Sequence, residues 1–404
     1  MEDRLVEQFG AFSLSRLPAD KTTSIVRIDN PSASKQSTAT SSEIGSEHTP
    51  ATSVPSTSPS SPCNIGSTST VPTADIALSP LDIDETAVPS NPPGVSEDET
   101  EESCCEVRET AGKGQGLFAT RSIKAGTLVF KESPLINLSR QEEKSSKSIK
   151  AAFHALDRTQ KKVYKALFDL QKGDVDPVVG IYYSNCYSTD AFAIEGSDDP
   201  LAHGGSCIGA LASRINHSCV PNVCLFYVPP TDPDKPAEMH FYAFRPIAKG
   251  KEILSNYNKH MFNGTKKRQQ IFLHQYGFTC SCEACVPPSA FWAKSDKRRG
   301  EMRKLIEELA GLEQEWEKHN ASSPRPEIVR RPIAALVALE SLLVKEKLID
   351  RPLRNVYKSL AKWTVRAGEV PRTWLEKELA VTVLISGKGS RWSLTLDGEL
   401  RRQA

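Results

Sequence analysis

The sequence lacks the long apolar runs that membrane proteins need. Nowhere do about 18 apolar residues follow one another, the length that a membrane-crossing helix requires. The opening residues, MEDRLVEQFG, carry acidic side chains and no apolar core of the kind that a secretory signal contains. We therefore expect no membrane partner and an intracellular location, in the nucleus, the cytoplasm or both.

An excess of either charge sign is also missing. The 51 Lys and Arg residues face 50 Asp and Glu residues, which leaves a formal net charge of +1. Basic residues gather only in two short triplets, at residues 266–268 and 297–299, which are typical of solvated helix faces and are poor import signals. We therefore expect no direct contact with nucleic acid. The sequence neither implies nor excludes a homo-oligomer.

Apolar and aromatic residues are scarce from residue 22 to residue 102, where Ser, Thr and Pro predominate and an acidic run closes the segment. Such a segment buries too little apolar surface to offset its chain entropy. We predict a disordered leader over residues 1–103. The same composition also fits a phosphorylated regulatory or docking tail, but we assign it no chemistry.

Folded patterning begins near Cys105, where β-branched and aromatic residues alternate with glycine and charged turns and predict short strands and hairpins. Residues 223–228 and 239–244 predict a further hairpin around a Pro-rich loop. Apolar residues at helical spacing predict a helical insert at about 147–205. From residue 291 to residue 404 the pattern predicts an α-helical domain of about four helices. The fold class is therefore α+β.

The cysteines are better explained as thiols or metal ligands than as disulfides, because reducing compartments keep disulfides rare. Cys280, Cys282 and Cys285 lie within six residues, and a tetrahedral zinc site would need one more ligand from elsewhere. Cys219 is the best candidate for that ligand, and unrelated buried thiols are the alternative explanation. Other cysteines remain available for the fourth position: Cys186, Cys207 and Cys224.

Four short motifs follow one another in a recognisable order. They are Gly-Gln-Gly at 114–116, Arg-Ile-Asn-His-Ser-Cys at 214–219, Gly-Lys-Glu-Ile-Leu-Ser-Asn-Tyr at 250–257, and Tyr-Gly-Phe-Thr-Cys-Ser-Cys-Glu-Ala-Cys at 276–285. Taken singly, Gly-x-Gly is an ordinary hairpin turn and Asn-His an ordinary hydrogen-bonded pair. In this order they resemble the SET family of protein lysine methyltransferases over residues 107–285. The similarity is greatest to fungal SET proteins related to the SET-and-MYND group, and it includes Gly-Ile-Tyr-Tyr-Ser-Asn at 180–185.

The resemblance implies a β-rich SET fold over residues 104–260, followed by a zinc-binding post-SET segment over residues 261–290. In that fold the segment ending at Tyr257 threads beside Asn216 and His217 to form a pseudoknot. The implied cofactors are S-adenosyl-L-methionine as cosubstrate and a structural zinc ion. The implied partner is a protein substrate with an accessible lysine, histone or non-histone.

The resemblance also assigns roles to single residues. Tyr257 would be catalytic, and Cys219 would join Cys280, Cys282 and Cys285 on zinc. Within the cofactor site, the glycine motif would hold the methionine end, the Asn-His pair would line the adenosine side, and Phe278 would pack against the adenine. The cofactor-binding residues implied in this way are Lys113, Gly114, Gly116, Asn185, Asn216, His217, Tyr257 and Phe278.

The chemistry of methyl transfer explains why a tyrosine is expected at this place. A neutral amine attacks the sulfonium methyl carbon in line, so the site must supply a deprotonated lysine and its alignment. An apolar aromatic channel disfavours the charged ammonium and lowers the lysine pKa. A phenol at Tyr257 would orient the amine and methyl groups through oxygen contacts. Tyr242 and Tyr276 are candidate walls of the channel, with plain core positions as the alternative.

Two departures from the family pattern leave other functions open. No Cys- and His-rich MYND finger lies between Lys131 and Asn185, and Lys251 and Leu254 stand where Glu and Thr are common in the family. A non-catalytic SET module that acts as a protein-interaction scaffold is therefore the main alternative to an active methyltransferase. A zinc-dependent nucleic-acid binder ranks last.

Overall fold

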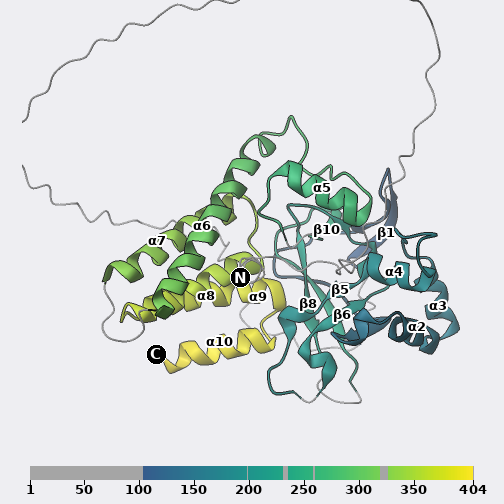
Figure 1. Ribbon diagram of the computed structural model, residues 1–404, viewed down its shortest axis with the longest axis horizontal. Coiled ribbons are helices and arrows are strands. Elements are labelled where there is room, and N and C mark those ends of the chain that lie inside the picture. The colour runs from purple at the N-terminus through teal and green to yellow at the C-terminus, as the bar shows by residue number, and fades with distance from the viewer. Residues whose placement is uncertain (1–102, 198, 231–234, 258–259, 319–325, 404) are drawn as a thin grey trace, which may run out of the picture. The chain divides into compact units, whose positions relative to one another are not determined.

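The structure is a computed structural model that describes residues 103–197, 199–230, 235–257, 260–318 and 326–403 (Figure 1). The predicted disordered leader lies outside the described residues except for Ser103. The described residues belong to one compact unit, in which strands and short helices occupy the first half and long helices the second. None of the described helices combines the length and the apolar character that a membrane-crossing helix requires.

The described strands form three small sheets. In spatial order the first contains β1 (Cys105–Thr110), β2 (Gly114–Ala119), β10 (Glu252–Ser255) and β7 (Asn216–His217). The second contains β3 (Leu128–Glu132), β9 (Glu238–Ala243) and β8 (Val223–Val228), and the third β4 (Ile136–Ser139), β6 (Gly205–Ile208) and β5 (Tyr187–Ser188). The hairpin predicted over residues 223–228 and 239–244 is confirmed, because β8 and β9 pair antiparallel with Val223 opposite Ala243.

The first sheet brings distant segments of the chain together. Strand β10 pairs antiparallel with β2, where Ile253 faces Leu117, and parallel with β7, where Ser255 faces His217. A parallel pair cannot be closed by a tight turn, so this contact depends on the long excursion between the two strands. The side-by-side placement implied for the segments ending at His217 and Tyr257 is thereby confirmed.

Three α-helices form the insert between strands β4 and β5 of the third sheet: α2 (Ser146–Ala155), α3 (Arg158–Lys165) and α4 (Pro177–Asn185). Local sequence explains the breaks between them. Ser145 caps α2, Asp157 and Gln160 form a capping box at the start of α3, and Asp176 caps α4. The sequence pattern predicts one helical region, and capping residues divide that region into three helices.

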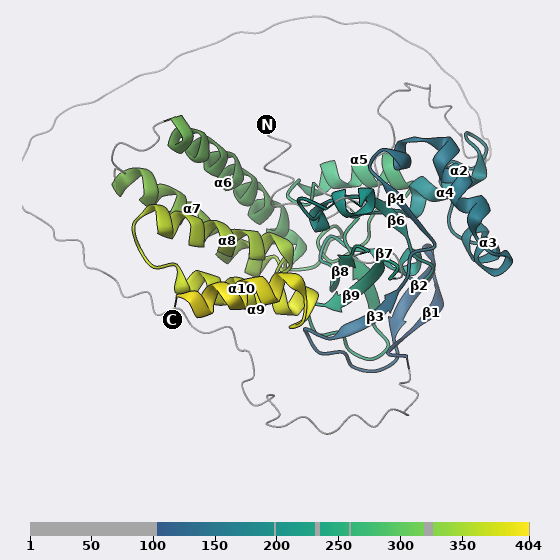
Figure 2. The same cartoon turned by 90° about the horizontal axis from the view of Figure 1, so that it is seen from below.

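The second half of the chain is helical. It contains α5 (Thr265–Tyr276), α6 (Trp292–Lys318), α7 (Pro326–Lys345), α8 (Arg351–Arg366), α9 (Arg372–Ser386) and α10 (Arg391–Arg402). Helices α2–α4 and α6–α10 form separate groups in Figure 2, and α9 contacts strands β8 and β9. These C-terminal helices have an apolar core of their own, in which Met302 and Ile306 of α6 pack with Leu339 of α7 and Leu360 of α8.

The expectation of about four helices after residue 291 was wrong. Helices α6 to α10 make five in the described part of that segment. The last apolar stretch divides because Gly387 ends α9 with a φ of 81° and the Ser390 side chain caps α10. Only glycine adopts such a φ without strain, so the chain turns there rather than continuing as one helix.

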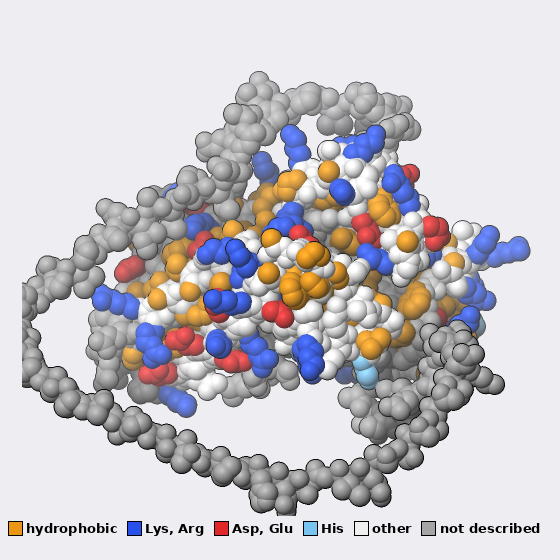
Figure 3. Space-filling view, turned by 90° about the horizontal axis from the view of Figure 1, so that it is seen from above, with side chains coloured by type: hydrophobic (Ala, Val, Ile, Leu, Met, Phe, Trp, Pro, Cys, Tyr) orange, Lys and Arg blue, Asp and Glu red, His pale blue; other side chains and the backbone are white. Residues whose placement is uncertain are grey.

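The face shown in Figure 3 has Lys and Arg side chains interspersed with acidic and apolar ones. The two basic triplets are not uniformly exposed. Arg268 and Arg299, the last residue of each triplet, are completely buried, whereas Lys266 and Lys297 are exposed. The expectation that both triplets are solvated helix faces is wrong for these two arginines, because neighbouring elements cover them.

Candidate active site and metal centre

Four cysteine sulfurs lie together at one end of the site. The sulfur atoms of Cys219, Cys280, Cys282 and Cys285 all lie within 4.8 Å of one another, and those of Cys219 and Cys285 are 3.5 Å apart. Zinc–sulfur bonds of about 2.3 Å in a tetrahedron place sulfurs roughly 3.8 Å apart, so the group has the size and the soft ligands of a closed zinc site. These residues can therefore hold a metal ion.

The other candidate cysteines lie elsewhere in the described part of the chain. Cys186 packs in the core of the helical insert, Cys207 lies in β6, and Cys224 packs against Phe244 and Ile385. Of the four cysteines considered for the remote position, the structure brings only Cys219 to the Cys-x-Cys-x-x-Cys loop.

Helix α5 holds this loop in place through two neighbouring side chains. The Gln269 side chain donates to the Cys280 carbonyl and accepts from its N–H, both at 2.7 Å. The buried Arg268 guanidinium donates to the Ala284 carbonyl at 2.8 Å and lies 3.3 Å from the Cys285 sulfur. Arg268 shares the buried face of α5 with Phe272 and Tyr276, at the four-residue spacing that places side chains on one side of a helix.

The electrostatics of the cluster favour thiolates at two positions. Hydrogen bonds from the Cys219 thiol lower the pKa of Cys285 to about 7, and similar bonds hold the pKa of Cys282 well below that of an ordinary thiol. Burial raises the pKa of Cys219 itself. Since the thiolate is the form that binds metal, a cation entering the cluster displaces the remaining thiol protons.

His217 connects the cysteine cluster to Tyr257. Its Nδ1 accepts the backbone N–H of Tyr257 at 3.0 Å, and its Nε2 lies 3.4 Å from the Cys219 sulfur. Burial lowers the pKa of His217 to about 3, so the ring is neutral. Because Nδ1 is an acceptor, the single ring proton is on Nε2.

An aromatic group surrounds Tyr257. The Tyr276 ring centroid lies 5.4 Å away and the Tyr276 hydroxyl donates to the Tyr257 carbonyl at 3.1 Å. Phe278 stands edge-on to Tyr257 at 6.5 Å and stacks on Phe272 at 5.4 Å. The Tyr257 hydroxyl donates to the Ile215 carbonyl at 2.5 Å, and burial raises its pKa well above that of a free phenol. The phenol therefore stays protonated, and its oxygen remains an acceptor for other groups.

Of the two tyrosines considered as walls of the lysine channel, Tyr242 and Tyr276, only Tyr276 lies beside Tyr257. Tyr276 contacts Tyr257, whereas Tyr242 lies in β9, where its hydroxyl approaches Gly387. Phe272 also belongs to the aromatic group, although it was not predicted from the sequence. Its spacing from Arg268 and Tyr276 along α5 is the signal that could have found it.

The opposite end of the site is polar. Asn216 Nδ2 donates to Glu252 Oε1 at 2.8 Å and to the Gln115 carbonyl at 3.2 Å, and Lys113 Nζ lies 3.2 Å from Glu252 Oε2. Glu252 is thus a site residue that was not predicted from the sequence, although it lies inside the third motif. The opposite charges of Lys113 and Glu252 lie side by side next to the glycine motif.

The glycines of this end have different roles. Gly114 is the first residue of β2, directly after the turn, and has a φ of 68°, whereas Gly116 lies inside the strand, opposite Arg108, and not in a turn as expected. A Cβ at Gly116 would lie 2.8 Å from Glu252 Oε1 and 2.9 Å from Asn216 Nδ2. Any side chain there would displace the polar group, so this position requires glycine.

Asn185 does not join this group through a described hydrogen bond. It ends α4, and its amide donates to the carbonyls of Phe168 and Ile181, each at 2.7 Å. The loop that follows Phe168 reaches the site instead, because Leu170 approaches Gly277 next to Phe278. Asn185 therefore supports a loop at the edge of the site.

Comparison with known proteins agrees with this arrangement. Residues 114–258 match the family described as "SET domain". The chain is 30% identical over 191 residues to "Histone-lysine N-methyltransferase set5" of Schizosaccharomyces pombe, covering 47% of this chain and 53% of that protein. It is 32% identical over 133 residues to human "N-lysine methyltransferase SMYD2", covering 33% of this chain and 27% of that protein.

A third relative is matched over most of its length. The chain is 30% identical over 198 residues to "Putative SET domain-containing protein L678" of Acanthamoeba polyphaga mimivirus, covering 43% of this chain and 74% of that protein. The chain spans about half the length of the Schizosaccharomyces pombe relative, since 53% of it is covered. From the matched motifs, the parallel pairing of β10 with β7 and these relatives, we conclude that this chain belongs to the SET-domain family and that its SET domain is homologous to those of protein lysine methyltransferases.

Proposed function

We propose that this protein is an S-adenosyl-L-methionine-dependent protein-lysine N-methyltransferase that acts inside the cell, in the nucleus or the cytoplasm, on a histone or another protein. One observation supports this most directly. The protonated Tyr257 phenol lies among aromatic rings, and its backbone is held by His217, between a polar end and the cysteine cluster.

The residues suit the proposed cosubstrate. When bound, S-adenosyl-L-methionine supplies an electrophilic methyl carbon. Lys113 and Glu252 offer opposite charges to an amino-acid carboxylate and ammonium, and Gly116, which has no Cβ, lets the Glu252 carboxylate lie close to the backbone of β2. Phe278 offers a partly buried ring face suited to stacking on a heterocycle. Asn216 contacts Glu252, and the neutral His217 next to it lies 6.0 Å from the Phe278 ring, so this pair connects the two ends.

The surroundings of Tyr257 suit the acceptor lysine. Tyr276, Phe278 and Tyr257 itself present aromatic surface that replaces the hydration of an ammonium group and lowers its pKa. The Tyr257 proton is held by the Ile215 carbonyl, so the phenol oxygen is free to accept contacts from the amine and the methyl group. The chain thus aligns a neutral amine rather than forming a covalent intermediate.

We also propose that Cys219, Cys280, Cys282 and Cys285 hold a structural zinc ion. Support comes from their four clustered sulfurs, which would fill all four positions of a tetrahedral structural site. A metal there would fix the loop that carries Phe278 relative to His217.

Lys251 and Leu254, which differ from the family pattern, favour the alternative of a non-catalytic interaction scaffold. The backbone at both residues is nevertheless hydrogen-bonded within the SET fold. The Lys251 carbonyl accepts the Ala119 N–H at 2.9 Å, and the Leu254 N–H is bound by Asn222 Oδ1 at 2.8 Å. Leu254 also lies opposite Asn216 in the parallel pair. These substitutions therefore leave the strand pairing of the site intact.

The test is to incubate the full chain with tritiated S-adenosyl-L-methionine and histone octamers or a protein array, with calorimetric binding of the cosubstrate measured on the same sample. We expect binding and transfer of label to lysine. Binding without transfer to any protein would favour the scaffold, and a folded chain that does not bind the cosubstrate would contradict the proposal.

A further inference from the structure

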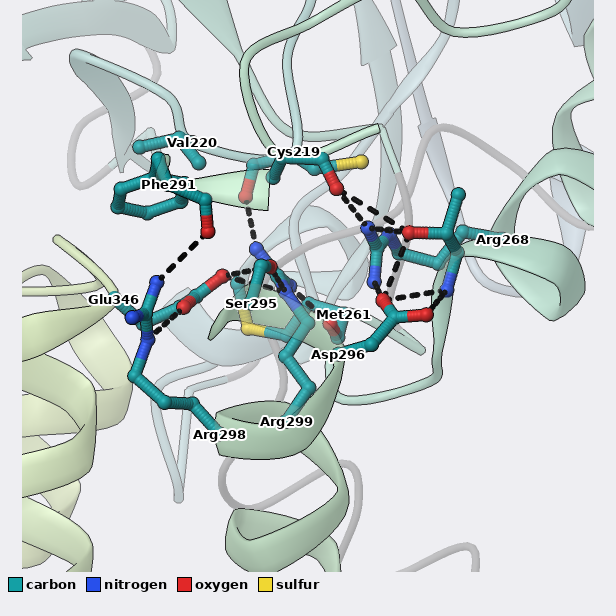
Figure 4. Close-up of polar contacts among 12 residues, drawn as sticks. Cys219, Val220, Met261, Arg268, Phe291, Ser295, Asp296, Arg298, Arg299 and Glu346 are labelled. Carbon is teal, nitrogen blue, oxygen red and sulfur yellow. Dashed lines mark hydrogen bonds and ion pairs between the residues drawn. The ribbon is translucent and has the colours of Figure 1, made fainter. Parts of the chain in front are cut away.

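Arg299 connects the cysteine cluster to the C-terminal helices. It lies near the start of α6 and is fully buried, as is Glu346, which follows α7 (Figure 4). Arg299 Nε donates to Glu346 Oε1 at 2.8 Å and to Ser295 Oγ at 3.2 Å. A buried ion pair of this kind is maintained only when further hydrogen bonds satisfy both groups.

The remaining nitrogens of Arg299 reach out of the helical region. Nη2 donates to the carbonyl of Cys219 at 2.7 Å, and Nη1 donates to the carbonyl of Met261. One planar guanidinium therefore joins α6, the end of α7 and the residue that supplies the remote sulfur of the cluster. Only arginine can serve acceptors in several directions at once from one rigid group.

The carbonyls of Cys219, Val220 and Pro221 are held by two arginine side chains. Arg245 takes the next two, donating to Val220 at 2.9 Å and to Pro221 at 2.6 Å. The Cys219 carbonyl is the one taken by Arg299. The peptide that follows Cys219 is thus held on its carbonyl side by a residue of α6 and on its N–H side by Ser218 Oγ, which accepts the Val220 N–H at 3.1 Å.

The charges around the cysteine cluster favour the same contact. Four thiolates around a divalent cation leave an excess of negative charge, and Arg268 and Arg299 are the buried cations beside it. Arg298 pairs with the same carboxylate, Glu346 Oε2, at 2.5 Å, so the single Glu346 charge is shared and does not fully neutralise Arg299. When the cluster holds a metal, its excess negative charge therefore further stabilises the Arg299 guanidinium beside Cys219.

We propose that Arg299 is a positioning residue that couples metal occupancy of the cysteine cluster to the docking of α6 and α7. The inference rests on the metal site of the proposed function. Metal binding orders Cys219, the Cys219 carbonyl holds Arg299, and Arg299 holds Glu346. Coupling of this kind is reciprocal, so loss of the arginine contact weakens metal binding and loss of metal loosens the helices.

The chain offers a matched pair of variants for the test. Arg299→Lys and Arg298→Lys make the same chemical change at adjacent residues that share Glu346, but only Arg299 contacts Cys219 and Met261. Both keep the positive charge that the buried carboxylate needs, so both are expected to fold. We would measure zinc affinity of the full-length variants by competition with a chelator.

We expect Arg299→Lys to bind zinc about 10- to 100-fold more weakly, the usual effect of losing a group that orients a metal ligand, and Arg298→Lys to remain within about twofold of the wild type. Unchanged affinity in Arg299→Lys, or an equal loss in Arg298→Lys, would overturn the inference.

The reciprocal readout is hydrogen exchange of the amides around Ser295 and Glu346 with and without zinc. Removal of metal is expected to speed exchange in the wild type and to have less effect in Arg299→Lys. Exchange that does not respond to zinc in a wild-type chain that carries it would overturn the coupling but leave the metal site standing. A reconstituted wild-type chain that carries no zinc would overturn both.

Discussion

At the residue scale, the proposed chemistry depends on the phenol of Tyr257. Its ring is fixed by Tyr276 and Phe278, its backbone by His217, and its proton by the Ile215 carbonyl. Together these contacts restrict the position of the Tyr257 phenol oxygen. Orientation to within a fraction of an ångström is what an in-line transfer requires from a group that forms no covalent bond.

Tyr257→Phe removes that oxygen while keeping the ring. We expect methyl transfer to fall at least about tenfold, which is ~1.4 kcal/mol of transition-state stabilisation, with cosubstrate binding and metal content unchanged. Initial rates with tritiated cosubstrate would measure it. Tyr242→Phe is the matched control, because Tyr242 approaches Gly387 rather than Tyr257. Full activity in Tyr257→Phe would remove the catalytic assignment.

Gly116→Ala places a methyl group between Asn216 and Glu252. A Cβ there lies under 3.0 Å from both side chains, so the polar end must open. We expect the dissociation constant for S-adenosyl-L-methionine to rise about tenfold or more, measured by calorimetry. Gly389→Ala is the control, since no atom lies within 4 Å of a Cβ at that position. Equal affinities in the two variants would show that Gly116 does not border the cosubstrate.

At the element scale, the packing of the C-terminal helices uses buried charges as well as apolar faces. Helix α8 buries Val356, Tyr357 and Leu360 on one side, as its period predicts. Its N-terminus carries Asp350 and Arg351, both buried, and the Arg351 guanidinium donates to the Leu225 carbonyl of β8. The contact between α8 and the second sheet is therefore partly electrostatic.

Asp350 makes a pH dependence at this contact predictable. Burial raises its pKa from 3.8 to about 6, so between these values the folded state binds more protons than the unfolded state and stability falls as pH rises. Relative to Asp350→Asn, the wild type should lose roughly 2 kcal/mol of unfolding free energy between pH 4 and pH 6 and only about a further 0.4 kcal/mol above pH 6. Denaturant unfolding of both proteins across this range measures the difference, and a constant difference would contradict the assignment.

At the scale of the whole molecule, the cysteine cluster lies where the SET core, α5 and α6 meet. Arg268 and Gln269 of α5 contact the Cys-x-Cys-x-x-Cys loop, and Arg299 of α6 contacts Cys219. A metal bound at this junction would act on all three elements, because binding free energy at a site absent from the unfolded chain contributes to folding.

Removal of zinc with a chelator should therefore lower Tm. A metal present at about a thousand times its dissociation constant adds ~4 kcal/mol to the free energy of unfolding. For a folded domain of about 150–250 residues this corresponds to an increase in Tm of roughly 8–16 °C. Thermal unfolding with and without chelator measures the shift. In Cys282→Ser, which loses one sulfur of the cluster, the chelator should have no further effect. A similar shift in that variant would indicate a metal bound elsewhere.

The sequence by itself determined the features that depend on neighbours along the chain. The β8–β9 hairpin follows from strand patterning, the three clustered cysteines from their spacing, and Tyr257 from its place in a motif. Backbone and ligand geometry within one short segment is set locally, so such features are visible without a fold.

Only the tertiary structure decided the features that join distant segments. It placed Cys219, 66 residues before Cys285, beside the other sulfurs, and it buried Arg268 and Arg299 although their triplets resemble exposed helix faces. It also set Glu252 against Asn216 and left Asn185 at the edge of the site. Burial and long-range contacts depend on which surfaces pack against an element, and the period of the element alone does not carry that information.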